Sequence, residues 1–285
     1  MRIARFALED EVRYGIVQDD DVAGADGAAG AEHPGQGHAD GGRPGGLSVA
    51  EIAGHPFGPG PENVRLTGAR YAVDDVRLLA PILPSKIVAV GRNYAEHARE
   101  LGNEPPAEPL IFLKPSTAVI GPGDPIARPA AFSKRVDFEG ELAIVFGRLC
   151  RDVPEARVPE VIFGYTCAND VTARDLQARD GQWTRAKGFD TFCPLGPWIE
   201  TGLDAADVRL STTVNGEIKQ DSRTSLLIHG IATLVSYVTA VMTILPGDVL
   251  LTGTPAGVGP MVAGDTVSVW IEGIGTLTNR VVDGS

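Results

Sequence analysis

Short apolar runs separated by turns dominate the chain from residue 80 onward. Runs rich in Val, Ile, Thr and aromatic residues are typical of β-strands. They are found at residues 86–91, 110–114, 141–146, 161–167, 208–216, 249–253 and 266–273. Helical spacing is rarer and is found mainly at 94–101 and 226–245. Because strands dominate and do not alternate regularly with helices, the pattern predicts a β-rich α+β domain and argues against a doubly wound nucleotide-binding fold.

The first part of the chain has a separate strand pattern. The apolar runs ARFAL, YGIVQ and VRLLA alternate with turns, and Pro81 and Pro84 then interrupt the pattern. We therefore predict a small N-terminal domain over 1–79 and a larger domain over 80–285. Residues 23–46 are rich in Gly and Ala and contain no Val, Ile, Leu or Phe, so we expect a flexible loop there.

The stretch 226–245 is long enough to span a membrane and contains no Asp, Glu, Lys or Arg. His229, Gly230 and several hydroxyl residues interrupt it, and its apolar side chains recur at helical spacing. This pattern favours a buried helix of a soluble domain. The first residues also lack the long apolar run of a signal peptide. We therefore expect a cytoplasmic protein with no membrane partner.

Acidic residues outnumber basic ones, with 37 Asp and Glu against 25 Lys and Arg and a net charge of −12. This balance argues against a nucleic-acid partner, because a negative surface repels phosphate. Three cysteines without a Cys-x-x-Cys pair argue against a disulfide framework or a thiolate zinc site. The chain also lacks GxGxxG, GxxxxGK(S/T), HExxH and GxSxG motifs, the usual signals of dehydrogenases, P-loop proteins, zinc proteases and serine hydrolases.

The run Val136–Phe146 carries two glutamates within an apolar strand pattern. Alternate side chains of a strand share a face, so Glu139 and Glu141 lie together while residue 140 faces away. Two neighbouring carboxylates in apolar surroundings repel each other unless a cation neutralises them, and oxygen ligands favour Mg²⁺, Mn²⁺ or Ca²⁺. The alternative is a strand end at which the glutamates meet water or Arg135.

A third carboxylate, Asp170, ends the next strand-like run. The junction of a strand with the following element is a common position for a ligand. Three carboxylates and one divalent cation leave one net negative charge, which suits a chelating anionic substrate if other cations are near. The alternative role for Asp170 is to cap a helix over 171–177.

Further candidates lie on a predicted helix and in two later segments. His97 and Glu100 are three residues apart, so the carboxylate can orient the imidazole and raise its basicity for general-base catalysis. Lys187 is one of only five lysines and can bind an anionic substrate or a developing enolate. The turn at Thr254 can present N–H groups and a hydroxyl to a carboxylate. The alternatives are an ordinary surface helix, a solvated lysine and a hairpin corner.

Several segments, taken in order, resemble the fumarylacetoacetate hydrolase family. They are KIVAVGRNYAEHARE (86–100), FLKPSTAVIGPGDPI (112–126), VDFEGELAIVFG (136–147), GYTCANDVTARDLQ (164–177), AKGFDTFCPLGPWI (186–199), TVNGE (213–217) and LPGDVLLTGTPAGVG (245–259), followed by GD (264–265) and EGIG (272–275). The resemblance implies a mixed β-roll catalytic domain behind a small N-terminal domain. It also implies assembly as a homodimer.

The resemblance also implies roles for individual residues. The expected metal ligands, for Mg²⁺ or Mn²⁺, are Glu139, Glu141 and Asp170. The expected catalytic residues are His97, Glu100 and Lys187. The residues expected to bind substrate are Arg92, Tyr94, Arg174, Gln177 and Thr254. The chain departs from the family pattern at Gly140, where a bulkier apolar residue is usual; this departure can loosen the strand but leaves the ligands in place.

Substrates of this family share a 2-oxo acid end, which can chelate a metal through its carboxylate and keto oxygens. The resemblance therefore implies a divalent-metal-dependent hydrolase that cleaves a C–C bond in a 2,4-dioxo acid, an acylpyruvate such as fumarylpyruvate, through a pyruvate enolate held by the metal. Oxaloacetate decarboxylation and 2-hydroxyhepta-2,4-diene-1,7-dioate isomerisation are the close alternatives. A more remote alternative is a non-catalytic, metal-bound binding protein. The expected partner is a small anionic 2-oxo acid, whose acyl group the sequence does not identify.

Overall fold

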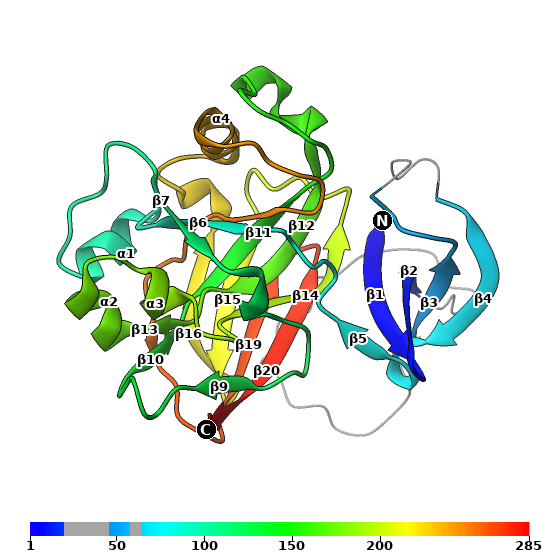
Figure 1. Cartoon of the computed structure of the whole chain (residues 1–285), viewed down its shortest axis with the longest axis horizontal. Helices are drawn as coiled ribbons and strands as arrows, with labels where there is room; N and C mark the ends of the chain where they lie inside the picture. Colours follow the sequence, from blue (N-terminus) through cyan, green and yellow to red (C-terminus); the bar gives the residue numbers. More distant parts are fainter. Residues whose placement is uncertain (20–45, 58–63, 285) are drawn as a thin grey trace.

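The computed structural model describes residues 1–19, 46–57 and 64–284. Within these residues, three β-sheets are combined with four short α-helices (Figure 1). The β-rich α+β fold expected from the sequence is confirmed. The loop expected at 23–46 lies outside the described residues except for Gly46.

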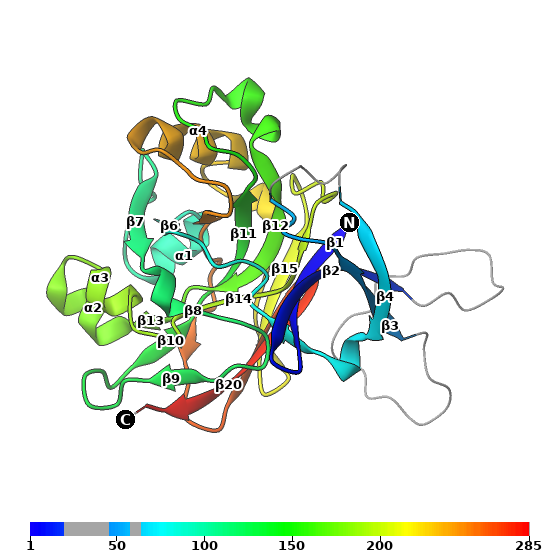
Figure 2. The same ribbon diagram turned by 45° about the vertical axis from the view of Figure 1, so that its right-hand side comes forward.

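The N-terminal strands form one end of the largest sheet. They are β1 (Arg2–Leu8), β2 (Glu11–Asp19), β3 (Leu47–Ile52), β4 (Leu66–Ala72) and β5 (Arg77–Leu79), with the 3₁₀ turn η2 (Val73–Asp75) before β5. β1 pairs antiparallel with β14 (Cys193–Glu200), with Ile3 opposite Ile199. Figures 1 and 2 both show β1–β4 to one side of the other strands, so this pairing joins two parts of the molecule through backbone hydrogen bonds.

The other strands of this sheet carry most of the predicted apolar runs. In order from β14 they are β12 (Ile162–Asn169), β11 (Gly140–Phe146), β17 (Val249–Leu251), β6 (Ile87–Gly91) and β7 (Leu110–Lys114), while β8 (Val119–Ile120) pairs with β14. The sheet is mixed, because β17 and β6 run parallel and most other neighbours run antiparallel. All seven strands predicted from the apolar runs are present, and five of them belong to this sheet.

Two smaller sheets complete the β-structure. One has the order β16 (Glu217–Arg223), β15 (Arg209–Val214), β19 (Thr266–Ile271), β20 (Gly275–Asp283) and β9 (Ile126–Arg128). The other consists of β13 (Thr172–Ala173), β10 (Val136–Phe138) and β18 (Gly259–Pro260). Leu210 and Val269 of the five-stranded sheet share one buried core with Leu142 of β11 and Phe6 of β1. This core therefore also ties the N-terminal strands to the centre of the molecule.

The helices are short and lie around the strands. They are α1 (Ala95–Glu100), α2 (Arg174–Asp180), α3 (Thr184–Lys187) and α4 (Ile231–Val241), with 3₁₀ turns η3 (Ser116–Ala118), η4 (Glu155–Glu160) and η5 (Thr224–Leu226). α4 shares a core with Ile144 and Phe146 of β11 through Leu234 and Val238. The helix expected near 226–245 is present but shorter, because the backbone is extended at Gly230 before it and at Met242 after it. Among the described residues, every helix is too short or too polar to cross a membrane.

The apolar pattern did not predict β14, which lies in the middle of the largest sheet. Pro194 and Pro197 cannot donate ladder hydrogen bonds, so a segment that contains both does not resemble a central strand. The segment is extended because β1 and β12 lie on either side of it. Seven of its eight residues are buried.

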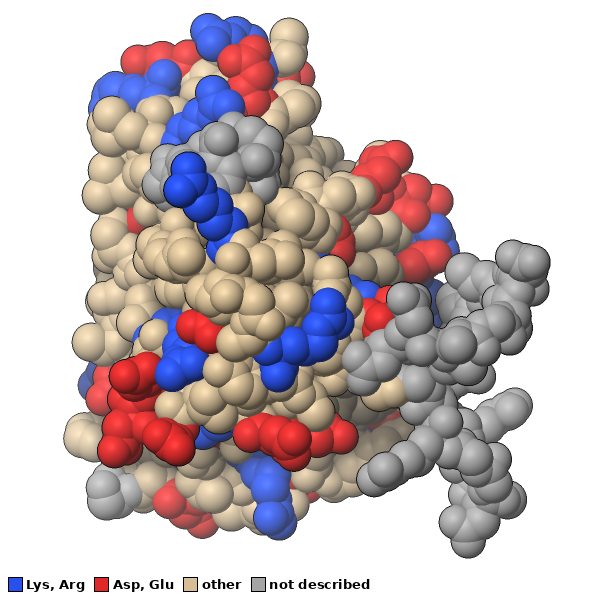
Figure 3. Space-filling model, turned by 90° about the vertical axis from the view of Figure 1, so that its right-hand side faces the viewer, with Lys and Arg blue, Asp and Glu red and all other residues tan. Residues whose placement is uncertain are grey.

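Figure 3 views the molecule from the side of the N-terminal strands. Acidic and basic side chains are interspersed on this face around a broad area that carries neither kind. Among the described residues visible there, Lys and Arg do not form the continuous basic stripe that is typical of nucleic-acid-binding surfaces.

Gly140 packs against the five-stranded sheet where β11 faces β15. A Cβ atom at residue 140 would lie only 2.0 Å from Oγ1 of Thr212. The N–H of Gly140 donates to Oε1 of Gln220 at 2.9 Å, so the backbone is held close to the second sheet. This crowding is the physical reason for glycine at the position where the family resemblance leads us to expect a bulkier residue.

Replacing Gly140 by Ala is expected to lower the free energy of unfolding by about 1–3 kcal/mol, because overpacking forces buried neighbours apart. Urea unfolding measures this change. Among the described residues, Oγ1 of Thr212 has no hydrogen-bond partner, so Thr212→Ala alone should cost less, and the double variant should recover much of the lost stability. A double variant no more stable than Gly140→Ala would contradict the proposed clash.

Candidate metal centre and its cavity

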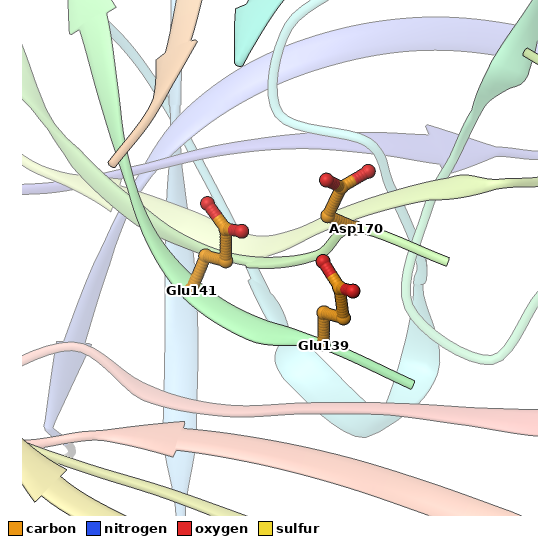
Figure 4. A group of neighbouring side chains, drawn as sticks. All are labelled: Glu139, Glu141 and Asp170. Atoms are coloured by element: carbon orange, nitrogen blue, oxygen red, sulfur yellow. The ribbon is translucent and has the colours of Figure 1, made fainter. Parts of the chain in front are cut away.

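Three carboxylates from two neighbouring strands meet in the interior. Glu141 belongs to β11, Glu139 directly precedes that strand, and Asp170 directly follows β12. The antiparallel register places Gly140 opposite Asn169, and the N–H of Asp170 donates to the carbonyl of Glu139 at 2.8 Å. One carboxylate oxygen of each acidic residue lies within 4.8 Å of the others, and Figure 4 shows the three side chains pointing toward one another.

The alternative roles considered for these acidic residues are wrong. Arg135 donates to Asp137 at 2.9 Å instead of meeting the glutamates. The N-cap of α2 is Ala173, because β10 holds residues 172 and 173 extended and the helix begins only at Arg174. Asp170 is therefore not a helix cap. All three carboxylate residues are at most 4% exposed, so they do not form a solvated strand end.

Three cations surround two of the carboxylates. Lys114, at the end of β7, donates to Oδ1 of Asp170 at 2.5 Å. Lys187, at the end of α3, donates to Oε2 of Glu139 at 2.8 Å and to Oδ2 of Asp170 at 2.5 Å. Arg174, at the start of α2, donates to Oε1 of Glu139 at 2.6 Å. These charge-assisted hydrogen bonds permit Glu139 and Asp170 to be buried as carboxylates.

Glu141 is in a different environment. Its Oε2 accepts the N–H of Gly253 at 2.7 Å, and within the described part of the chain no Lys or Arg pairs with it. Burial, followed by the negative charges of Asp170 and Glu139, raises the pKa of Glu141 well above its usual range. Among the described residues, Glu141 thus lacks a positively charged partner of its own. A divalent cation would supply it, and an all-carboxylate ligand set suits Mg²⁺ or Mn²⁺.

We expect Mn²⁺ binding to displace a proton from Glu141. The raised pKa favours the protonated form of this side chain, whereas a ligand must be a carboxylate, so Mn²⁺ affinity should rise with pH by up to about tenfold per unit as long as Glu141 carries a proton. Titration calorimetry in two buffers of different ionisation enthalpy measures both the affinity and the released proton. Glu141→Gln should bind Mn²⁺ more weakly and release no proton. Equal wild-type affinity at about pH 6 and about pH 8 would contradict this expectation.

A cavity of about 220 Å³ reaches the acidic cluster, a size suited to a small organic acid. Its walls contain eight of the residues assigned to the site from the sequence, namely Arg92, His97, Glu139, Glu141, Arg174, Gln177, Lys187 and Thr254. Leu101, Asn103, Ala178 and Trp183 are also among the lining residues. Asp170 and Glu100 do not line the cavity but hydrogen-bond to residues that do.

Helix α1 brings the predicted histidine–glutamate pair to the cavity wall. His97 is only 3% exposed, and its Nδ1 lies 3.2 Å from Oε2 of Glu100. Oε1 of Glu100 accepts the N–H of Gly257 at 3.0 Å, so this carboxylate is held from two sides. When Nδ1 carries the proton toward Glu100, Nε2 is the basic nitrogen of the ring. The burial of His97 excludes an ordinary surface helix.

The turn after β17 donates a hydrogen bond to the carboxylate of Glu141. Gly253, which donates to Glu141, has a φ of +104°, and a Cβ atom there would lie 2.6 Å from Cβ of Asn93. The hydroxyl of Thr254 donates to the carbonyl of Gly140 at 2.9 Å and accepts from Gln220 at 2.8 Å. The N–H of Gly253 and the hydroxyl proton of Thr254, considered above for binding a substrate carboxylate, are therefore already used within the protein.

Comparison with known proteins identifies the family. Residues 86–282 match the sequence profile described as "Fumarylacetoacetate (FAA) hydrolase C-terminal", which covers more than half of the chain. The chain belongs to the fumarylacetoacetate hydrolase family. Residues 1–81 match the profile "Rv2993c-like, N-terminal". The expected fold, a family-type catalytic domain with a small N-terminal domain, is therefore confirmed.

Similar members of the fumarylacetoacetate hydrolase family differ in their described activities. Protein Rv2993c of Mycobacterium tuberculosis is 61% identical over 244 residues, which are 85% of this chain and 90% of that protein. The 2-hydroxyhepta-2,4-diene-1,7-dioate isomerase from Mycobacterium marinum, whose crystal structure is known, is 51% identical in sequence to this chain. The two structures match with a TM-score of 0.84 over 100% of this chain and 99% of the isomerase chain. The maleylpyruvate hydrolase from Sphingobium sp. SYK-6, whose crystal structure contains manganese(II) and pyruvate, is 32% identical in sequence to this chain. The two structures match with a TM-score of 0.74 over 100% of both chains.

The site of this family member contains residues that the sequence reasoning did not assign. Lys114 is 1% exposed and pairs with Asp170. Its signal in the sequence was the scarcity of lysine and its place in the segment FLKPST. Asp137 accepts a hydrogen bond from Arg174, and Trp183 lines the cavity, but neither had a distinctive local pattern.

Two predicted substrate contacts have different positions. Arg92 lines the cavity, whereas Tyr94 is 3% exposed and does not line it. Burial, followed by the charge of Glu141, raises the pKa of the Tyr94 phenol. The backbone of Tyr94 forms an isolated bridge with Leu227. A contact between Tyr94 and substrate therefore stays a prediction.

Proposed function

We propose that this protein uses a divalent cation to bind a 2-oxo acid and to stabilise its enolate. The observation that carries the proposal is the buried triad of Glu139, Glu141 and Asp170, which borders a cavity of small-acid size and lacks a cation partner at Glu141. Mg²⁺ or Mn²⁺, held by these carboxylates, would supply a Lewis acid. Lys187 and Arg174 add positive charge beside the position where the enolate develops.

The reaction that we propose first is isomerisation of 2-hydroxyhepta-2,4-diene-1,7-dioate or a similar diacid. Its support is the 51% identity with a protein described as an isomerase of this compound. The reaction removes the proton of the 2-hydroxyl group and returns a proton to carbon, so that no C–C bond breaks and no water is consumed. We assign this proton transfer to His97, which lines the cavity and is oriented by Glu100.

Hydrolysis of a C–C bond in an acylpyruvate is the second candidate. The similarity to maleylpyruvate hydrolase supports it, but at a lower identity of 32%. The His97–Glu100 pair favours it chemically, because an oriented imidazole can take a proton from water as the oxygen attacks the C4 carbonyl. The C3–C4 bond then breaks, and the pyruvate enolate that leaves is protonated at C3. The hydrolase predicted from the sequence thus ranks behind isomerisation.

The Mn²⁺-loaded protein is expected to convert 2-hydroxyhepta-2,4-diene-1,7-dioate to its 2-oxo isomer, with a change in ultraviolet absorbance. Excess EDTA should abolish this activity, because the Lewis acid is removed, and added Mn²⁺ should restore it. Parallel assays with fumarylpyruvate and oxaloacetate compare the other reactions. Faster release of pyruvate from fumarylpyruvate would favour the hydrolase. No turnover of any compound with Mn²⁺ bound would favour a binding protein.

His97→Asn is expected to lower kcat by about 10²–10⁴-fold, because the variant lacks a group of suitable basicity to carry the proton. Mn²⁺ affinity should stay within about twofold of the wild-type value, since the three carboxylates are intact. Glu100→Gln should reduce kcat less, because the imidazole is then only less well oriented. A wild-type kcat in His97→Asn would remove His97 from the proposed proton transfer.

A further inference from the structure

Arg92 differs from the other cations of the cavity wall. Lys187 is neutralised by Glu139 and Asp170, and Arg174 also pairs with Glu139. Arg92 lines the same cavity, but among the described residues it forms no ion pair. It is partly buried, so its positive charge is incompletely solvated. A guanidinium in such a position is suited to receive an anion from the cavity.

The backbone at Arg92 is strained. Its φ of +58° lies in the left-handed region, which is unfavourable for a residue with a side chain other than Asn or Asp. The next residue, Asn93, is fully buried and holds this conformation through its side chain. The amide of Asn93 donates to the carbonyls of Thr252 and His229 and accepts the N–H of His229. The fold therefore maintains an unfavourable conformation that directs Arg92 to the cavity wall.

Two neighbouring aromatic rings contact Arg92 and Lys187. The guanidinium carbon lies 5.7 Å from the ring centre of Trp183. The Trp183 ring is in edge contact with Phe112 at 5.2 Å, and Nζ of Lys187 lies 5.1 Å from the Phe112 ring. The stacking orients the guanidinium but leaves its in-plane N–H groups available as donors. Arg92 is thus a second positive group of the cavity wall, next to the Trp183 ring, whereas the Lys187 ammonium is next to the Phe112 ring.

We propose that Arg92, stacked on Trp183, binds a second carboxylate of the substrate and thereby selects dicarboxylates over monocarboxylates. The inference rests on the proposed function, in which the acidic cluster and its cation bind the 2-oxo acid end. A planar guanidinium offers two parallel N–H groups to a carboxylate, whereas an uncharged end of the same length would leave it without a partner. This contact between Arg92 and the second carboxylate determines which substrates bind. It applies equally whether the bound substrate is then isomerised or hydrolysed.

The test compares two unreactive ligands that differ only at the distal end. They are 2-oxoheptanedioate and 2-oxoheptanoate, and pyruvate serves as a probe of the metal end alone. Calorimetry on the Mn²⁺-loaded wild type is expected to show the dioate binding at least about tenfold more tightly than the heptanoate, as for a charge-assisted hydrogen-bonded pair. Pyruvate should bind in every variant.

Arg92→Met should reduce dioate affinity to that of the heptanoate and leave pyruvate affinity within about twofold. Arg92→Lys should recover part of the preference, because it keeps the charge but not the two parallel donors. Arg99→Met is the matched control, since Arg99 is exposed on α1 and does not line the cavity; it should retain the full preference. Arg92→Gly removes the guanidinium while adopting the left-handed backbone without strain, so it should fold even if Arg92→Met does not.

The outcomes separate this proposal from the proposed function. Equal wild-type affinity for the two seven-carbon acids would overturn the second carboxylate site while pyruvate binding still supports the 2-oxo acid site. An equal loss of pyruvate and dioate affinity in Arg92→Gly would also overturn it, because Arg92 would then act on the metal end. Failure of the Mn²⁺-loaded wild type to bind any of the three acids would overturn both proposals.

Discussion

The burial of three carboxylates whose oxygens lie within 4.8 Å of one another is the constraint on which the rest of this structure depends. In a medium of low polarity their repulsion would prevent folding unless opposite charges are equally close. Those charges come from Lys114, Lys187 and Arg174, which end β7, end α3 and begin α2. Helices α2 and α3 follow β12 closely along the chain, whereas β7 comes from a distant segment and must be brought to the junction of β11 and β12 by the fold.

The two faces of β11 have different surroundings. One face carries the glutamates into the cavity, and the other packs Gly140 so closely on Thr212 that no side chain fits. Gln220 links this contact to the turn after β17, because it accepts from Gly140 and donates to Thr254. The acidic cluster is thus supported from behind by a second sheet. Such support limits relaxation of the ligand oxygens when their charge changes.

The chemistry divides between a deep part and a wall of the cavity. The deep part contains the carboxylates and their cations and is suited to hold a 2-oxo acid as its enolate. The wall carries the His97–Glu100 pair and the separate positive site at Arg92, and both are supported by residues near the turn after β17. If the proposed enolate chemistry is shared within the family, different cavity walls would give a physical reason why similar proteins are described as isomerases and as hydrolases.

The sequence by itself determined the fold class, the strands that carry the acidic residues and the chemical types of the site, because these depend on local periodicity and on side-chain identity. Glu139 and Glu141 share a face of one strand whatever surrounds it, and His97 lies near Glu100 on any helix. Only the tertiary structure decided which charges compensate one another. The pairing of Lys114 with Asp170, the tight packing at Gly140 and the position of β14 in the sheet all depend on contacts between segments distant in sequence. The same holds for Arg92, which forms no ion pair among the described residues.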